Sequence, residues 1–248
     1  MDQSRFKAMW EQMQDDGYFM HHPHYQDYFG LELSDEDKAL DAAILELDFG
    51  KDDIVMPAPY SETLERAVKR TESEWLYRMF DLPASGTALD LGCGFGRSVI
   101  WLRERYDEVL ATDISSSVIE LAQRLIQSDN VRFFVNDADR LPAAINPESV
   151  DVAYIFTVFQ HIPREFAVNL LKQVADKLSP GGLAIFNLIS EVNETVNDGV
   201  VETEWAIGYS RQQTQSLVAD AGLTCERIVR WYRPENDVSW LWVAARKS

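Results

Sequence analysis

The stretch Ala88-Leu-Asp-Leu-Gly-Cys-Gly-Phe-Gly-Arg97 decides the fold of this chain, because an apolar run ends in three closely spaced glycines. The run predicts a buried strand over residues 87–91 that turns through Gly92, Gly94 and Gly96 into a helix. Glycines at such a turn adopt backbone angles that other residues avoid and let a ligand approach closely. Free N–H groups at the start of the helix attract negative charge. The stretch therefore predicts a ligand site at the carboxyl end of this strand.

Beyond this stretch, short apolar strands alternate with amphipathic helices, which predicts a doubly wound, mostly parallel α/β sheet. The expected strands cover residues 87–91, 109–112, 131–135, 152–156 and 183–188. Helices are expected after Gly96, around 118–125, at 167–178 with a stop at Ser179-Pro-Gly-Gly182, and from Ser210 to Gly222. Strands at 227–232 and 238–244 are joined too tightly for a crossover, so they predict a closing antiparallel hairpin. The expected sheet has seven strands.

Residues 1–80 show helical spacing of apolar residues instead. Three helices are expected there: one with Phe6, Met9, Trp10 and Met13 on one face, one after the capping box Ser34-Asp-Glu-Asp37, and one from about Ser61. A turn-rich junction at 81–86 follows. We therefore divide the chain into an N-terminal helical extension, 1–80, and a ligand-binding domain, 81–248.

The composition of the 248 residues is that of a globular protein, with 46% hydrophobic and 26% charged residues and a net charge of −18. Such a charge repels phosphate backbones and no Lys/Arg cluster offsets it, so nucleic acid is not an expected partner. The two cysteines, Cys93 and Cys225, have no metal-ligand or disulfide spacing. Neither a signal peptide nor a membrane-spanning run is found, so a cytoplasmic location away from membranes is expected.

The glycine spacing distinguishes between cofactors. A dinucleotide site has the pattern G-x-G-x-x-G, whereas here Gly96 gives G-x-G-x-G and Arg97 follows. With Asp90 in front, the segment resembles the first motif of class I S-adenosylmethionine-dependent methyltransferases. The resemblance covers about residues 80–248, and residues 1–80 match no family signature. It implies a Rossmann-like methyltransferase fold, S-adenosylmethionine as cofactor and S-adenosylhomocysteine as its product.

The resemblance also implies roles at the strand ends. The glycine turn would lie under the amino-acid part of the cofactor, Asp113 would accept hydrogen bonds from the ribose, and Asp137 with Ala138 would hold the adenine. Asp139 is an alternative to Asp137 in register. Cys93 is expected to contribute its backbone and not its thiol. The expected cofactor-binding residues are Asp90, Gly92, Cys93, Gly94, Gly96, Arg97, Asp113, Ile114, Asp137, Ala138 and Phe156.

The segment from Tyr154 to His161 resembles the part of the family where the transferred methyl faces the acceptor. His161 is the candidate catalytic residue because histidine titrates near neutral pH, while a purely structural role in holding the loop stays equally open. Aromatic residues near the N-terminus and in the long loop before residue 209 are expected to close over the pocket. The expected acceptor-binding residues are Tyr18, Tyr25, Tyr28, Gln160, His161, Trp205 and Tyr209.

His21, His22 and His24 form a cluster that could bind a metal, but no acid or cysteine spacing accompanies it, so no metal is expected. An aromatic lid is the preferred interpretation of this region.

The expected function is methyl transfer from S-adenosylmethionine to an oxygen or nitrogen of a small metabolite. The Asn/Asp-Pro-Pro-aromatic tetrad of enzymes that methylate amines of DNA bases is absent, since Phe156-Thr-Val-Phe159 occupies its place. Two alternatives stay open: transfer of another group, such as aminopropyl, and a cofactor-binding regulator without turnover. The identity of the small-molecule acceptor does not follow from the sequence, and a homodimer is compatible with it.

Overall fold

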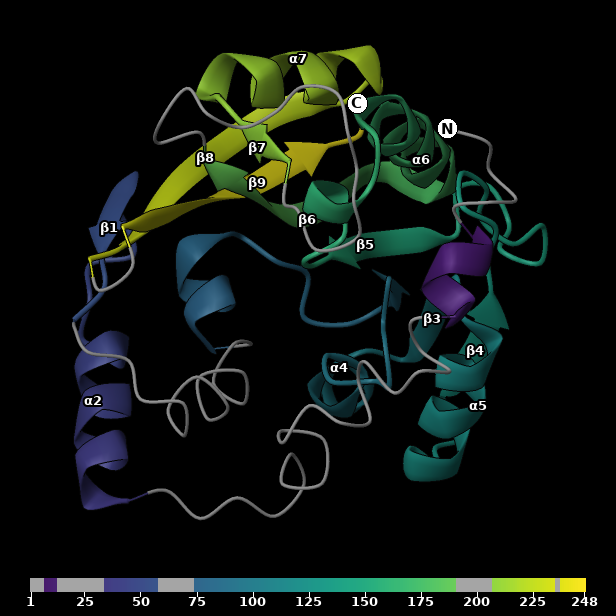
Figure 1. Ribbon diagram of the computed structural model, residues 1–248, viewed down its shortest axis with the longest axis horizontal. Helices are drawn as coiled ribbons and strands as arrows, with labels where there is room; N and C mark the ends of the chain where they lie inside the picture. Colours follow the sequence, from purple (N-terminus) through teal and green to yellow (C-terminus); the bar gives the residue numbers. More distant parts are fainter. Residues whose placement is uncertain (1–6, 13–33, 58–73, 191–206, 235–236) are drawn as a thin grey trace.

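The computed structural model describes residues 7–12, 34–57, 74–190, 207–234 and 237–248. Within these ranges the strands form one mixed sheet in the order β1-β8-β9-β6-β5-β2-β3-β4, with β7 beside β6 (Figure 1). The parallel strands expected from the sequence are β2 (Thr87–Leu91), β3 (Glu108–Asp113), β4 (Val131–Val135), β5 (Val150–Ile155) and β6 (Leu178–Ser190).

The closing hairpin is also confirmed. β8 (Thr224–Arg233) and β9 (Val238–Arg246) pair in antiparallel register, and β9 pairs in the same sense with β6. The mostly parallel α/β fold predicted from the alternation of strands and helices is therefore correct.

The sheet contains two strands more than the seven expected. β1 (Asp53–Val55) comes from the N-terminal extension and pairs in parallel with β8, and β7 (Gly208–Tyr209) pairs in parallel with β6. Both are too short to show an alternating pattern. Ser179-Pro-Gly-Gly182 also differs from expectation, because these residues lie inside β6 and the preceding helix ends at Lys177.

Helices cover both faces of the sheet (Figure 1). One face carries α6 (Arg164–Lys177) and α7 (Arg211–Asp220), and the other carries α4 (Val99–Arg105), α5 (Ser116–Leu125) and helical residues 74–79. α2 (Asp35–Leu45) lies in the N-terminal part, as does a helical turn at residues 7–12. Among the described residues no helix has both the length and the apolar character needed to cross a membrane.

Each face has its own apolar core. The face under α6 and α7 buries residues such as Leu170, Phe186 and Val218. The opposite face is strongly aromatic: the Trp75 ring lies 4.8 Å from that of Trp231 and 4.9 Å from that of Trp242. Rings at these distances add specific attraction to the gain from burying apolar area. Trp75 belongs to the N-terminal extension, so this part of the extension shares a core with the sheet.

Arg227 of β8 fastens the extension to the sheet. Its guanidinium donates to the carbonyls of Phe49, Lys51 and Met79 and to the carboxylate of Asp52. One side chain thus satisfies three backbone carbonyls and one carboxylate of the extension.

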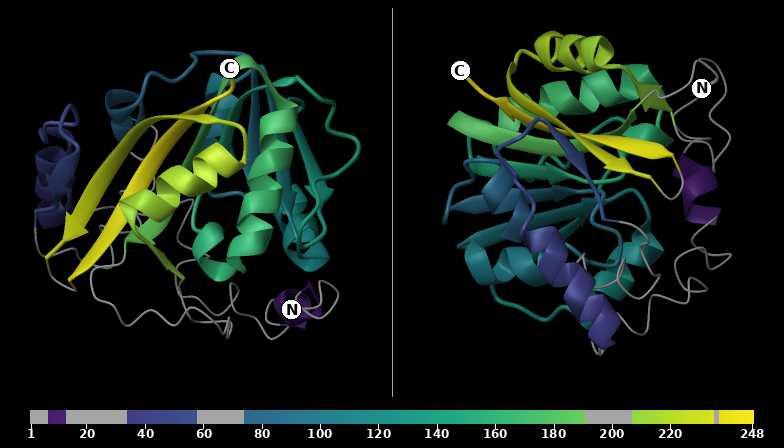
Figure 2. Two further views of the ribbon diagram at one scale, coloured as in Figure 1. Left: turned by 90° about the horizontal axis from the view of Figure 1, so that it is seen from above. Right: turned by 90° about the vertical axis from the view of Figure 1, so that its left-hand side faces the viewer.

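The order of the strands places the site. β2 pairs with β3 on one side and with β5 on the other, so the chain winds outward in opposite directions from this pair. Loops at such a reversal separate and leave a crevice at the carboxyl ends of the strands, which we call the carboxyl edge. Figure 2 (left) shows the helical turn at residues 7–12 at this edge and the C-terminus at the opposite one.

Candidate functional site

The glycine loop follows β2 at the carboxyl edge. Gly92, Gly94 and Gly96 have φ angles of +77°, +54° and +97°, all in the left-handed region that favours glycine. A Cβ atom at Gly92 or Gly96 would lie 2.3 Å from Val158 or 2.2 Å from Ile126, so a larger residue would have to displace that side chain and would be strained at the positive φ. A Cβ at Gly94 would meet nothing within 4 Å. Gly94 is therefore the point of the loop where a ligand can approach the backbone.

Asp113 holds this loop from the end of β3. Its Oδ2 accepts the N–H of Gly94 and its Oδ1 accepts the N–H of Ser115, both at 3.0 Å. Burial raises the pKa of the Asp113 carboxyl, and the backbone hydrogen bonds from Ser115, Gly94 and Ile114 oppose that shift. A carboxylate offers about four lone-pair positions, so each oxygen can accept a further hydrogen bond from a ligand hydroxyl.

Cys93 and Asp90 are both buried next to this loop. Burial raises the pKa of the Cys93 thiol well above its ordinary value, and the carboxylates of Asp113 and Asp90 raise it further. The thiol stays protonated at neutral pH and therefore is a poor nucleophile. This agrees with the expectation that Cys93 contributes its backbone only. Asp90 lies in β2 opposite Tyr154 of β5.

Arg97 is a partly buried cation just beyond the glycines. Burial lowers its pKa to about 10, so the guanidinium still carries its charge at neutral pH. Within the described part of the chain it makes no hydrogen bond or ion pair. A desolvated arginine of this kind is suited to binding an anionic group such as a carboxylate.

In the segment after β4, the structure distinguishes between the two candidate acids, Asp137 and Asp139. Asn169 of α6 donates to the carbonyl and the carboxylate of Asp139, at 3.1 and 3.3 Å, which directs Asp139 toward α6. The side chain of Asp137 is 60% exposed and forms an ion pair with Lys7 at 3.3 Å. Ala138 between them is buried. The arrangement favours Asp137 over Asp139 as the residue that faces a ligand.

Asn136 was not among the expected residues. It is buried at the carboxyl edge, and its Nδ2 donates to the carbonyl of Asp137 at 2.7 Å. Its Oδ1 is buried too and has no hydrogen-bond partner among the described residues. Buried polar atoms are nearly always paired, so this oxygen is a natural acceptor for a ligand N–H group.

The 3₁₀ turn η2 (Phe159–His161) follows β5 and carries two of the expected acceptor residues. Gln160 is only 2% exposed, and its Nε2 lies 3.3 Å from Nε2 of His161. Burial lowers the pKa of His161 from 6.5, so the imidazole is neutral at pH 7. The orientation of the Gln160 amide decides which ring nitrogen carries the proton: its NH₂ requires an unprotonated Nε2, whereas its oxygen would leave Nδ1 available as the base.

The helical turn at residues 7–12 lies over this part of the site. The ring of Trp10 meets that of His161 edge to face at 5.8 Å, and Lys7 reaches Asp137 as described above. The N-terminal extension therefore contacts both the η2 turn and the segment after β4.

Tyr209 is buried in β7 beside the end of β6. Burial raises its pKa to about 12, and its hydroxyl has no hydrogen-bond partner among the described residues. The guanidinium of Arg164 lies 5.0 Å from the centre of the Tyr209 ring and donates to the carbonyl of Gly208 at 2.6 Å. Arg164 begins α6 directly after the His161 segment, and no sequence pattern marked it.

Two expected cofactor residues lie deeper than the loop. The Phe156 ring is 4% exposed and packs 5.1 Å from that of Trp242 and 5.6 Å from that of Tyr154, so it forms part of the aromatic core below the site. Ile114 is partly buried between β3 and α5 and packs against the other core.

Tyr18, Tyr25, Tyr28 and Trp205 lie outside the described residues, as does the cluster of His21, His22 and His24. Their predicted roles stay predictions. In the part of the chain that is described, no group of three or more His, Cys, Asp or Glu residues is placed to hold a metal ion.

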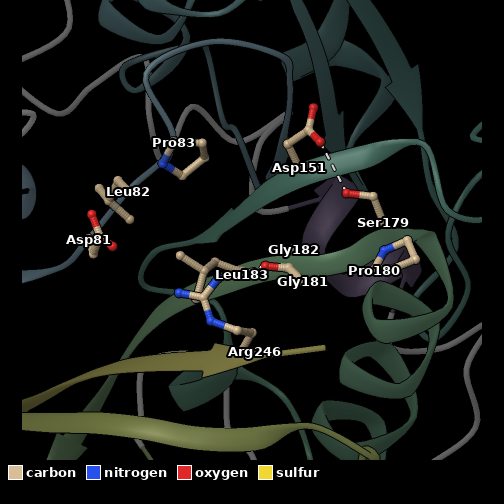
Figure 3. Close-up of a pocket in the computed structure, with 10 residues that line it drawn as sticks. All are labelled: Asp81, Leu82, Pro83, Asp151, Ser179, Pro180, Gly181, Gly182, Leu183 and Arg246. Atoms are coloured by element: carbon tan, nitrogen blue, oxygen red, sulfur yellow. Dashed lines mark hydrogen bonds between the residues drawn. The ribbon is translucent and has the colours of Figure 1, made fainter. Parts of the chain in front are cut away.

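A separate pocket of about 290 Å³ lies at the amino ends of the central strands, opposite the carboxyl edge (Figure 3). Three of its four polar or charged side chains, those of Asp151, Ser179 and Arg246, are already used by the fold. Asp151 accepts hydrogen bonds from Ser179 at 3.0 Å and from the backbone of Thr87 at 2.7 Å. Arg246 is bonded to Glu226 and to the carbonyl of Gly181. With these groups engaged, the pocket offers little to a ligand, and the candidate site stays at the carboxyl edge.

Comparison with known proteins agrees with this assignment. Residues 88–182 match the family model of the methyltransferase domain. Methyltransferase GfsG of Streptomyces halstedii is 32% identical over 179 residues, which are 66% of this chain and 60% of that protein. Methyltransferase nsrG of Aspergillus novofumigatus is 30% identical over 145 residues, or 54% and 51% of the two chains. The chain thus spans little more than half the length of these relatives.

Among solved structures, the magnesium protoporphyrin IX methyltransferase of Synechocystis PCC 6803 with bound S-adenosylmethionine aligns with a TM-score of 0.62. The alignment covers 100% of this chain and 98% of that one at 16% identity, which establishes likeness of fold. The family-model match covers the glycine loop and the ends of β3, β4 and β5, where the cofactor residues were expected. Residues 88–182 are therefore similar to the methyltransferase domain, and the fold is that of S-adenosylmethionine-dependent methyltransferases of known structure.

Proposed function

We propose that the chain catalyses methyl transfer from S-adenosylmethionine to an oxygen or nitrogen of a small metabolite. The observation that carries this proposal is the glycine loop, held at Gly94 by the carboxylate of Asp113 and open above Gly94. Gly92 and Gly96 leave no free space for a side chain, and Gly94 faces open space. Together they form a cradle for the amino-acid part of the cofactor. The cradle lies at the strand-order reversal, where α/β sheets bind their ligands.

The residues around this cradle fit the cofactor in chemistry. Arg97 would bind its carboxylate, and Asp113 would accept hydrogen bonds from the ribose. The buried Oδ1 of Asn136 and the exposed carboxylate of Asp137 would accept from the adenine amino group. Phe156 would support the site from the aromatic core. The cofactor, when bound, supplies a methyl group activated by a positively charged sulfur.

The chain's own contribution is alignment. In the transfer, the acceptor atom forms a bond to the methyl carbon while the carbon–sulfur bond breaks, which leaves a neutral thioether. A rigid loop on one side and the η2 turn on the other hold the two partners in line. An acceptor that carries a proton must lose it, and the neutral imidazole of His161 is the candidate base at the carboxyl edge.

A small-molecule acceptor is supported by three observations. The net charge of −18 disfavours nucleic acid. The tetrad of DNA-amine methyltransferases is replaced by Phe156-Thr-Val-Phe159. One structural relative that aligns over the whole chain is a magnesium protoporphyrin IX methyltransferase.

The N-terminal extension, residues 1–80, is proposed to form a lid over this site. Two contacts support the proposal: the ion pair of Lys7 with Asp137 and the ring contact of Trp10 with His161. Both join the extension to residues that face the proposed ligands. Removing water from a methyl-transfer site and orienting the acceptor are the tasks of such a lid.

The test is transfer of label. The protein is incubated with methyl-labelled S-adenosylmethionine and a metabolite extract, and the label is followed by mass spectrometry. Label in a small molecule would support the proposal and identify the acceptor class. Label only on added protein, or no transfer although S-adenosylhomocysteine binds, would contradict it.

A further inference from the structure

Thr157, the second residue after the end of β5, has an unusual backbone conformation. Thr157 has φ of +59°, and only two other non-glycine residues in the described part of the chain, Glu148 and Asp237, have positive φ. The left-handed region is unfavourable for a β-branched residue such as threonine. A conformation of this kind persists only where its surroundings enforce it, and it often marks a functional site.

Asn187 of β6 bonds directly to the backbone of Thr157. The Asn187 side chain is 4% exposed, and its Oδ1 accepts the backbone N–H of Thr157 at 2.7 Å. Asn187 faces the aromatic side of the sheet, in register with Trp242 of β9. A polar amide among aromatic rings needs a specific partner, and the Thr157 N–H is that partner. The threonine hydroxyl in turn donates to the carbonyl of Phe156 at 2.6 Å.

The turn held in this way touches the cofactor loop. A Cβ atom placed on Gly92 would lie 2.3 Å from Cγ2 of Val158, so the valine side chain occupies the space directly above Gly92. Val158 follows Thr157 immediately, and its direction depends on the backbone angles of Thr157. A continuous series of contacts thus runs from Asn187 in β6, through Thr157, to Gly92 after β2.

We propose that Asn187 is a positioning residue of the methyl-transfer site. By holding Thr157 in the left-handed conformation it seats Val158 on Gly92, and this sets the spacing between the glycine loop and the η2 turn. Cofactor and acceptor meet between these two elements, so the inference rests on the proposed function. Asn187 acts through its neighbours and need not contact either ligand.

The test measures binding of S-adenosylhomocysteine by calorimetry, which needs no acceptor. Asn187→Ala removes the hydrogen bond, and we expect roughly tenfold weaker binding. The double variant N187A/T157G should regain most of the affinity, because glycine adopts the left-handed conformation without strain.

Ser179→Ala is the matched control. Ser179 lies in the same strand and its side chain also makes hydrogen bonds, but at the opposite edge, where its hydroxyl donates to the Val150 carbonyl and to the carboxylate of Asp151. It should leave the affinity unchanged. If N187A fails to fold, Thr157→Val and Thr157→Gly replace it, with weaker binding expected for valine only.

Three outcomes would overturn the inference: unchanged affinity in N187A, no recovery in the double variant, or equal losses in N187A and S179A. An N187A protein with a lower melting temperature but normal affinity would likewise show a merely structural residue. Failure of the proposed function is a different result, because it would appear with the wild type in the label-transfer experiment, as no labelled small molecule, and not as a difference in affinity between the variants.

Discussion

The carboxylate of Asp113 and the backbone N–H of Gly94 are joined by a hydrogen bond of 3.0 Å, so the end of β3 holds the middle of the loop that follows β2. The same carboxylate accepts the N–H of Ser115 ahead of α5. One buried side chain therefore ties together the two strand ends that flank the proposed cofactor. The expectation from the sequence assigned Asp113 to the ribose, and the structure adds this second task.

Replacing Asp113 with asparagine should therefore impair both tasks. The amide has a single acceptor oxygen, whereas the N–H groups of Gly94 and Ser115 each need an acceptor. We therefore expect a loss of about 1–3 kcal/mol in the free energy of unfolding. Binding of S-adenosylhomocysteine should weaken by roughly tenfold or more. Urea denaturation and calorimetry measure the two effects. Asp129→Asn, at an exposed position in the loop after α5, is the control and should change neither.

Arg97→Met tests the anion-binding role of Arg97. Loss of a charge-assisted contact with the carboxylate should weaken S-adenosylhomocysteine binding by about 10- to 100-fold. Binding of 5′-methylthioadenosine, which lacks the amino-acid part, should stay the same. Arg124→Met on the exposed side of α5 serves as the control. Equal losses for both ligands would place Arg97 outside the carboxylate site.

His161 should cause the rate of methyl transfer to fall at acid pH, which gives the pH–rate profile an acid limb. Because burial lowers its pKa below 6.5, the imidazole is neutral at pH 7, and activity should fall as the pH drops through that lowered value. The free energy of unfolding should change in the same direction. Below pH 6.5 His161 is protonated in the unfolded chain but still neutral in the folded chain, so acidification favours unfolding. A pH profile of His161→Gln that keeps the same acid limb would exclude His161 as its source.

Cys93→Ala should retain activity within about twofold, since a protonated, buried thiol contributes no nucleophile. Turnover and S-adenosylhomocysteine affinity measured side by side would check this. A fall of about a hundredfold in turnover at unchanged affinity would instead indicate a reacting thiol.

Arg227→Ala should lower the free energy of unfolding by about 2–4 kcal/mol, because it leaves several backbone carbonyls of the extension without their donor. Arg132→Ala provides the contrast. Arg132 is more than half exposed and pairs with Glu108 on the surface, and its loss should cost about 0.5 kcal/mol or less. Similar values for both variants in urea denaturation would show that Arg227 does not anchor the extension.

The parts of the fold that were predictable have signals within a single segment. β2 and β3 are apolar runs, and the helix after Ser210 has both halves of its capping box. β1 has no such signal, since three residues cannot show a period and its partner β8 lies far away in the chain. Ser179-Pro-Gly-Gly182 has the composition of a turn, and propensity cannot show that Leu178 before it pairs with Val150 and that Leu183 after it pairs with Val152 and Arg246.

The candidate site also contains residues that were predictable from the sequence and residues that were not. Gly92, Gly94 and Asp113 stand in a motif whose spacing is visible in the sequence. Asn187 and Arg164 have no motif, because their roles depend on neighbours that only the folded sheet brings together: the N–H of Thr157 for one and the ring of Tyr209 for the other. A lone asparagine inside an apolar strand is the one local hint that a buried amide has a specific partner.

The reversed direction of β9 has a practical consequence. Because this strand runs back along β6, the chain finishes at the amino ends of the central strands, where Lys247 exchanges backbone hydrogen bonds with Gly181 and Gly182. A fluorophore or surface tether attached to Ser248 would therefore sit on the far side of the sheet from the glycine loop. Single-molecule recordings of ligand arrival and departure could use that attachment point and leave the carboxyl edge clear.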